Sequence, residues 1–187
     1  MNIEEKINDL LKNEMTDESF ALWEFVKSKF TNIFNRPTSS TGKYHKRKDG
    51  SIPTCGEHTY EMLYAFVKIK DAFTKAKTNH YDSILLSIVL HDMCKYGTTN
   101  ALYAKHTSNK HDQIIGDVIN KNKQIFSKVL GDDHCLLLEQ SVRYHSGRWS
   151  TDVNKTKKFT FSDFNPETQL LHTLDMLSTK SLLNSDI

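Results

Sequence analysis

The sequence predicts an all-α domain, a bundle of helices without a sheet. Only three prolines and seven glycines occur in 187 residues, so long segments run without a helix breaker. Apolar residues in these segments recur at helical spacing, and only Lys158 to Phe161 suggests the alternation of a strand. The length suits one domain over residues 1–187, in which N-terminal helices of residues 1–35 pack on a core of residues 36–187.

The N-terminal part of the chain predicts two short helices and a long loop. Ile3 to Leu11 has amphipathic spacing, and Thr16 can cap a second helix whose apolar face runs from Phe20 to Phe30. A loop is expected from Arg36 to Gly56, because two prolines and three glycines lie there among Ser, Thr and Lys. Loops of this length are often functional, and the alternative is a linker between two domains.

Helical spacing resumes after this loop and continues along the rest of the chain. The predicted segments are helices at Glu57 to Thr74, His80 to Cys94, Asn109 to Leu130 and Cys135 to Tyr144, a loop at Ser146 to Pro166, and a helix at Glu167 to Leu183. No internal repeat is visible, so these helices are expected to form one bundle.

Charge and composition narrow the classes of protein. The formal net charge is +2, which gives no overall field that would point to nucleic acid or a membrane. Basic residues cluster between Lys43 and Lys48 and between Lys155 and Lys158, either as solvated loops or as a rim that attracts phosphate. No apolar segment approaches the ~18 residues that span a bilayer, and the N-terminus does not resemble a signal peptide.

Cysteine usage points to a reducing compartment. The three cysteines Cys55, Cys94 and Cys135 lie far apart without CxxC spacing, which argues against a disulfide framework or a zinc knuckle. They suit small buried residues in the cytosol. We therefore expect a cytoplasmic protein without a membrane partner, and the sequence leaves the oligomeric state open.

The most informative feature is the dipeptide His91-Asp92, which follows an apolar run from Ser83 to Leu90. Burying two such polar side chains is costly without a partner, and a divalent cation would be one. Asp175 poses the same problem, since it lies in the otherwise apolar stretch Leu170 to Leu177. Imidazole and carboxylate together suit Zn, Mn, Fe, Co or Ni, and Mg less well.

Four candidate metal ligands come from three predicted helices, which can bring them together only by packing in a small bundle. They are His58, His91, Asp92 and Asp175. A second site would add His111 and His145, with Asp92 as a bridge between two ions. Any single histidine is more often a surface or capping residue than a ligand. That ordinary role is expected for His45, His80, His106, His134 and His172.

These residues, in this order, resemble the HD-domain metal-dependent phosphohydrolase superfamily. The likeness extends to the segments Pro37 to His45, Gly56 to Thr59, His91 to Gly97, Lys110 to Gly116, Tyr144 to Trp149 and Leu171 to Lys180. It covers most of the chain, and is closest to small single-domain members and to the HD domain of 3′–5′ exoribonucleases. The resemblance implies an HD-type helical bundle with the metal site between its helices, and one or two divalent ions (Mn, Fe, Ni, Co, Zn or Mg).

By this resemblance, His58, His91, Asp92 and Asp175 hold the first ion, and His111 and His145 join Asp92 at the second. Lys95 follows His91 by about one helical turn, so a continuing helix would direct its ammonium group toward the site. We expect Asp92 to orient a water and Lys95 to offset phosphate charge, although Lys95 could also be an ordinary exposed lysine. Further candidates for binding substrate are Lys43, Arg148 and Lys180 for phosphate, and Tyr44 and Trp149 for stacking on a base.

The activity that the resemblance implies is hydrolysis of a phosphate ester by a metal-activated water. A nucleotide or short oligonucleotide is favoured over long RNA, because the extra nucleic-acid-binding module of the exoribonucleases has no counterpart in this sequence. Two alternatives stay open. A regulatory module would bind metal and nucleotide without turnover, whereas an HD-fold di-iron oxygenase would bind iron, absorb visible light and take up oxygen.

Overall fold

The computed structural model confirms the all-α prediction over the residues that it describes, which are 1–30, 33–41, 45–72, 76–98, 104–150, 160–180 and 182–183. Its α-helices in these ranges are α1 (Ile3–Glu14), α2 (Asp17–Lys27), α3 (Cys55–Asp71), α4 (Asn79–Leu90), α5 (His111–Lys121), α6 (Lys123–Leu130), α7 (Asp132–Tyr144) and α8 (Pro166–Thr179). Short 3-10 helices lie at Ile33–Asn35, Gly147–Trp149 and Phe161–Asp163. None of the described helices combines the length and apolar character needed to cross a bilayer.

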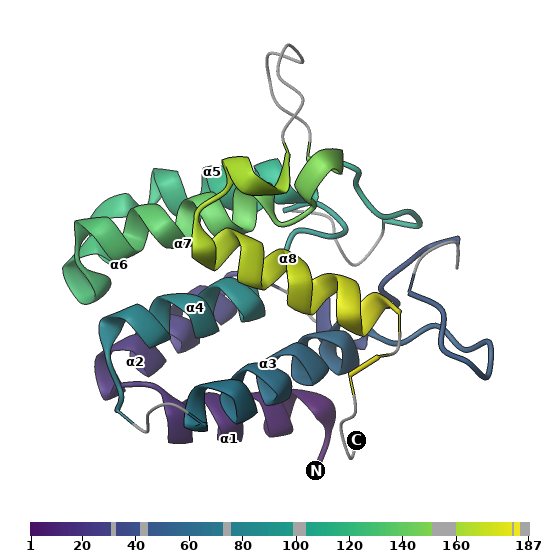
Figure 1. Ribbon diagram of the computed structural model, residues 1–187, viewed down its shortest axis with the longest axis horizontal. Coiled ribbons are helices and arrows are strands. Elements are labelled where there is room, and N and C mark those ends of the chain that lie inside the picture. The colour runs from purple at the N-terminus through teal and green to yellow at the C-terminus, as the bar shows by residue number, and fades with distance from the viewer. Residues whose placement is uncertain are drawn as a thin grey trace.

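The helices form two groups, which are joined through direct packing of α4 on α6 and α7 and through α8. Figure 1 shows α1 to α4 on one side of the molecule and α5 to α7 on the other, with α8 crossing between them. The central helix is α4, which packs against α2, α3, α6, α7 and α8 and is buried at every residue from Asp82 to Leu90. Because α8 also packs against α3 and α7, the bundle brings parts of four helices together.

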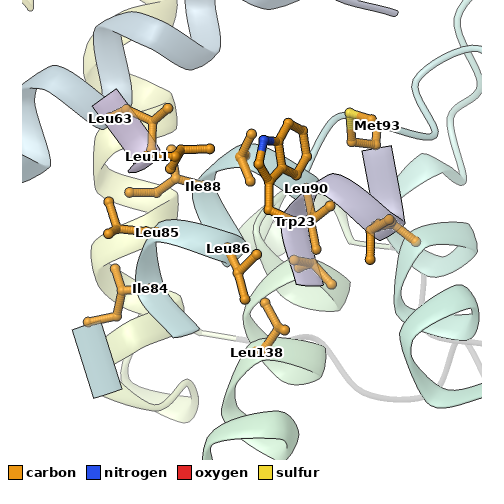
Figure 2. Close-up of a cluster of buried hydrophobic side chains, with 14 of the residues drawn as sticks. Leu11, Trp23, Leu63, Ile84, Leu85, Leu86, Ile88, Leu90, Met93 and Leu138 are labelled. Carbon is orange, nitrogen blue, oxygen red and sulfur yellow. The ribbon is translucent and has the colours of Figure 1, made fainter. Parts of the chain in front are cut away.

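The hydrophobic core is built around α4 and Trp23. Figure 2 shows the indole of Trp23 among aliphatic side chains that include Leu11, Leu86 and Leu90. The ring of Trp23 is fully buried, and its Nε1 donates to Asn8 Oδ1 at 3.0 Å, so burial leaves no unpaired donor there. The N-terminal helices therefore share one buried apolar cluster with the later helices.

Local capping signals explain where several helices begin. Asn2 and Glu5 form a capping box at α1, and Thr54 and Glu57 form another at α3. The predicted cap Thr16 accepts a hydrogen bond from a backbone N–H in the first turn of α2. The box at Thr54 matters most for function, because it fixes the start of α3 one turn before His58.

The region predicted as one helix from Asn109 to Leu130 forms two helices, so that prediction was wrong in this detail. The break lies at Asn122, whose side chain donates to the Val118 carbonyl at 2.7 Å. A side chain that competes for a backbone carbonyl in this way favours a helix end. The chain then re-enters a helix at once, and α6 begins at Lys123.

Two other expectations need correction. The helix predicted up to Cys94 ends at Leu90, and the residues that follow form consecutive turns. The strand-like pattern from Lys158 to Phe161 yields no strand in its described part, because Phe161 begins a 3-10 helix. Residues 158 and 159 lie outside the described residues. Elsewhere in the described chain, only an isolated bridge between Pro37 and Thr54 pairs two extended segments.

Candidate metal centre

The six predicted ligands come together where five helices meet. Their positions are His58 on α3, His91 at the end of α4 with Asp92 next to it, His111 at the start of α5, His145 at the end of α7, and Asp175 on α8. Their ligand atoms form overlapping groups, each within 4.8 Å, and two of these groups share Asp92. The bundle therefore gathers residues that are far apart in the sequence.

His58 connects the first group of predicted ligands, because it lies in one cluster with His91 and Asp92 and in another with Asp175. His58 Nε2 lies 3.3 Å from His91 Nε2 and 3.2 Å from Asp175 Oδ1. Asp92 Oδ2 lies 3.6 Å from His91 Nε2. Atoms that bind one ion at about 2.1 Å are separated by roughly 3.0 to 3.4 Å in octahedral or tetrahedral geometry. The two distances from His58 Nε2 therefore suit neighbouring ligands of one transition-metal ion.

The second group has similar spacing and uses the other oxygen of Asp92. His111 Nε2 lies 3.1 Å from Asp92 Oδ1 and 3.2 Å from His145 Nε2. His145 Nε2 lies 3.8 Å from the same oxygen. Because each carboxylate oxygen of Asp92 faces a different group, Asp92 has the position of a bridging ligand.

Hydrogen bonds to the main chain fix the tautomers of three histidines. The Nδ1 atoms contact carbonyls three residues earlier: His91 with Ile88 at 2.6 Å, His111 with Ser108 at 2.9 Å, and His145 with Val142 at 2.7 Å. A carbonyl can only accept, so Nδ1 carries the hydrogen and donates it. Each ring therefore directs Nε2 to the centre, and in the neutral form that nitrogen is unprotonated, as in a metal-binding histidine.

A side-chain relay does the same for His58. Ser178 Oγ donates to Glu61 Oε2 at 2.6 Å, and it therefore accepts from His58 Nδ1, which lies 2.8 Å away. Arg47 donates in turn to the other carboxylate oxygen of Glu61 at 3.2 Å. The fourth histidine thus also directs Nε2 to the centre, 3.2 Å from Asp175 Oδ1, and a hydrogen-bonded carboxylate behind it orients the ring.

Without a cation this arrangement is unfavourable, because pairs of nitrogen lone pairs face each other at close range in a buried place. For His91 and His145, protonation is no remedy near neutral pH, since burial lowers the pKa of His91 to about 4 and that of His145 to about 3. Asp92 Oδ2 is also buried without a hydrogen-bond partner among the described residues. The donors present therefore fit a divalent metal ion.

Both carboxylates of the centre are ionised. Burial alone would raise their pKa values, but Lys95 and His91 bring the pKa of Asp92 well below its usual range. For Asp175, the neighbouring His58 outweighs burial and lowers the pKa in the same way. The centre therefore offers negative charge, together with neutral imidazoles, to a cation.

Lys95 reaches the centre by a different route from the one predicted. The helix does not continue past Leu90, and a turn closed by the bond from Lys95 N to Asp92 O brings the side chain round. Lys95 Nζ donates to Asp92 Oδ1 at 3.0 Å and lies 3.5 Å from His111 Nε2. Its side chain is only 12% exposed, which excludes an ordinary surface lysine. Burial alone would lower its pKa, but the neighbouring carboxylates raise it, so the ammonium group stays charged.

The residues predicted to bind substrate, unlike the predicted ligands, have no described contact with the metal centre. Trp149 is 58% exposed and borders a cavity of about 410 Å³. The lining of this cavity is Gly147, Trp149, Thr160, Phe161, Phe164, His172 and Met176. Lys180 is exposed just beyond α8, and no described contact joins it to the centre. Lys43, Tyr44 and the side chain of Arg148 lie outside the described residues.

One histidine that was expected to be ordinary lies at the centre. A ring nitrogen of His45 is within 4.8 Å of ligand atoms of His58 and Asp175, which makes a third group. The sequence offered one signal, since His45 ends the segment Pro37 to His45 that resembles HD-domain proteins. His172 also has a role beside the centre, because its Nδ1 donates to the His145 carbonyl at 2.7 Å.

Comparison of the chain with protein-family models, curated proteins and solved structures finds no match. The resemblance to HD-domain phosphohydrolases therefore stays a prediction that rests on the residues themselves. The established facts are a helical bundle and buried groups of histidine and aspartate that could hold a metal ion.

Proposed function

We propose that this protein is a metal-dependent phosphohydrolase that cleaves a phosphate ester of a nucleotide or short oligonucleotide with water as the attacking group. The observation that carries the proposal is the buried cluster of unprotonated imidazole nitrogens and carboxylates with the charged Lys95 beside it. Nitrogen and oxygen donors in this ratio suit Mn, Fe, Co, Ni or Zn better than Mg. A centre with both divalent ions and a fixed ammonium group suits an anionic substrate.

Divalent ions in this centre would lower the pKa of a bound water toward neutrality and offset charge on the phosphoryl oxygens. The protein's own residues supply the geometry. Asp92 faces both groups of ligands, so it fixes their separation and offers an acceptor that can orient the attacking water. The four histidines, held by their Nδ1 bonds, cannot rotate without losing a buried hydrogen bond. Water orientation and charge placement are therefore set before substrate arrives.

Lys95 has the position of a phosphate-binding group. Its ammonium carries three N–H donors, and one of them is directed to Asp92 Oδ1. A second donor faces His111 Nε2 at 3.5 Å, and the third can bind a non-bridging phosphate oxygen on the side of the second group. Since phosphoryl transfer depends mainly on positioning and on electrostatic stabilisation, such a fixed cation contributes directly to the rate.

The cavity beside Trp149 supports a nucleotide as substrate. Its wall includes His172, whose Nδ1 donates to the carbonyl of His145, so one lining residue contacts the main chain of a predicted ligand. Trp149 and Phe161 expose about half of their surface there, at 58% and 50%. Exposed aromatic faces of this kind stack on bases with little preference for their identity.

Metal analysis of the purified protein followed by hydrolysis assays tests the proposal. The assays use mononucleotides and short oligonucleotides with Mn²⁺, Co²⁺, Ni²⁺ or Fe²⁺. Asp92→Asn should lose bound metal and reduce hydrolysis by about a thousandfold or more, since one charged ligand common to both groups disappears. The exposed Asp133→Asn is the matched control and should change neither.

Three other outcomes would overturn the proposal. A protein that binds no metal would remove its basis. Tight nucleotide binding without product would indicate a regulatory module instead. Bound iron with visible absorption and oxygen uptake, and no phosphate release, would indicate an oxygenase. Within an active enzyme, Trp149→Ala should raise KM for a nucleotide by about tenfold and leave KM for glycerol phosphate unchanged.

A further inference from the structure

His45 is held at the metal centre by an unusual backbone conformation. Its φ is 58°, and it is the only non-glycine residue with positive φ in the described part of the chain. This conformation costs an L-residue about 1 kcal/mol or more, and such strain persists where the surrounding structure requires it. The strained residue is therefore a reason to ask what its side chain does.

The side chain of His45 faces the first group of ligands. One of its ring nitrogens is within 4.8 Å of ligand atoms of both His58 and Asp175. The ring stands edge-on to that of His58, with ring centroids 4.7 Å apart and an interplanar angle of 80°. These contacts place His45 on the side of the centre away from His111 and His145, which belong to the second group.

The tautomer of His45 follows from its contact with Thr179. Thr179 Oγ1 lies 3.3 Å from Asp175 Oδ1 and 3.1 Å from His45 Nδ1. The hydroxyl has one hydrogen, and the ionised carboxylate can only accept it, so the hydroxyl oxygen accepts from Nδ1. His45 Nε2 is then left unprotonated. Ser178, the preceding residue of α8, fixes His58 in the same manner.

We infer that His45 is an additional ligand of the ion that His58 and Asp175 would hold, bound through Nε2. A separate third ion is excluded for this group, because His58 has only Nε2 free and an imidazole nitrogen binds one metal ion. Since His58 also belongs to the group with His91 and Asp92, an ion on His58 Nε2 could draw on His45 and Asp175 from one side and on His91 and Asp92 from the other. The inference rests on the proposed metal centre, but not on phosphate hydrolysis.

This assignment makes the two halves of the centre unequal. The first ion would have up to five protein ligands, whereas the second group offers only Asp92, His111 and His145. Sites filled by protein ligands are usually structural, while sites that keep open positions bind water and substrate. The reacting water and the phosphate therefore belong on the second half, where Lys95 also lies.

Cobalt binding to His45→Gly tests the inference. Glycine keeps the positive φ accessible and removes only the imidazole, so the loop is not strained further. Titration with Co²⁺, followed by visible absorption and by metal content, should show that one equivalent binds about tenfold more weakly, with a changed spectrum. Added imidazole should restore both the spectrum and the affinity. His134→Gln, a partly exposed histidine away from the centre, should behave as wild type.

Each other outcome has a definite meaning. If His45→Gly binds Co²⁺ with the wild-type affinity and spectrum, the inference is wrong although the metal centre stands. If the wild-type protein binds no Co²⁺, the proposed function fails first. Should His45→Gly fail to fold, Thr179→Val replaces it, because it removes only the hydroxyl that orients His45 and Asp175. An unchanged spectrum and affinity in that variant would also overturn the inference.

Discussion

The body of α4 and the turn that follows it are equally buried but chemically opposite. Leu86 and Leu90 are fully buried among apolar side chains, as Figure 2 shows. His91 and Asp92, directly after them, are 0% and 3% exposed among imidazoles and carboxylates. Leu86 and Leu90 are stabilised by excluding water, whereas the turn brings the acceptor atoms of several imidazoles and carboxylates within 3.8 Å of one another. Burial alone therefore does not mark the functional region. That region is distinguished by buried acceptor atoms that face one another and that a cation between them would stabilise.

The largest expected difference between these regions is in stability without metal. Trp23→Ala should lower the free energy of unfolding by about 3–5 kcal/mol, because it leaves a cavity in the core. Metal affinity of the folded protein should not change, since Trp23 does not contact the centre. Urea denaturation in EDTA and a Mn²⁺ titration measure the two quantities. Phe25→Ala on the same helix, where the ring is 43% exposed, should cost much less. A changed metal affinity in Trp23→Ala would contradict this separation of the regions.

Metal should stabilise the folded protein through the centre alone. At a free Mn²⁺ concentration about a hundred times Kd, the free energy of unfolding should rise by about 2.7 kcal/mol. Thermal melts with and without EDTA measure the effect. In Asp175→Asn the gain should vanish, because an ionised ligand is lost, while Asp133→Asn should keep it. A similar gain in Asp175→Asn would mean that the ion binds elsewhere.

The smallest effect, counted for one histidine and one pH unit, is a pH dependence of the metal-free protein. Burial lowers the pKa of His91 to about 4 and that of His145 to about 3, whereas an unfolded histidine titrates near 6.5. Between pH 6.5 and about 4, unfolding therefore takes up protons, and stability falls as the pH falls. Each histidine contributes about 1.4 kcal/mol per pH unit.

The variant His145→Gln tests this sign and size. Its free energy of unfolding, measured in urea with EDTA at pH 7, 6 and 5, should fall less steeply than that of the wild type. The slopes should differ by about 1.4 kcal/mol per pH unit in the acidic part of the range. Equal slopes would mean that His145 is not held neutral in the folded protein.

The fold was largely predictable because its signals are local. Apolar spacing predicted the helical segments, and Thr16 predicted the start of α2. The break at Asn122 was missed because buried Ile119, Phe126 and Leu130 keep seven- and four-residue spacing across it. The apolar pattern indicates which face of a segment is buried. It does not indicate where a side chain, such as that of Asn122, donates a hydrogen bond to a backbone carbonyl and ends the helix.

The candidate site was predictable only in part, for the same reason. His58, His91 and Asp175 were expected together from their order and from the family resemblance, and the bundle brings them together. The position of Lys95 depends on turns that helical spacing does not describe. His45 comes from a loop, where no periodicity exists, and its approach depends on a positive φ at a single residue. Such contacts follow from tertiary structure, so the sequence pattern could not supply them.

The large sequence separation between residues at the metal centre has a further consequence for the metal-bound protein. His58 and Ser178 contact each other from positions 120 residues apart, and they link α3 to α8. An ion held between these helices would act as a reversible cross-link that closes a very long loop. Separating the two helices would require that ion to leave first. The lifetime of the metal-bound fold would then be set by a dissociation rate, and a chelator would act on it as a slow trigger of unfolding.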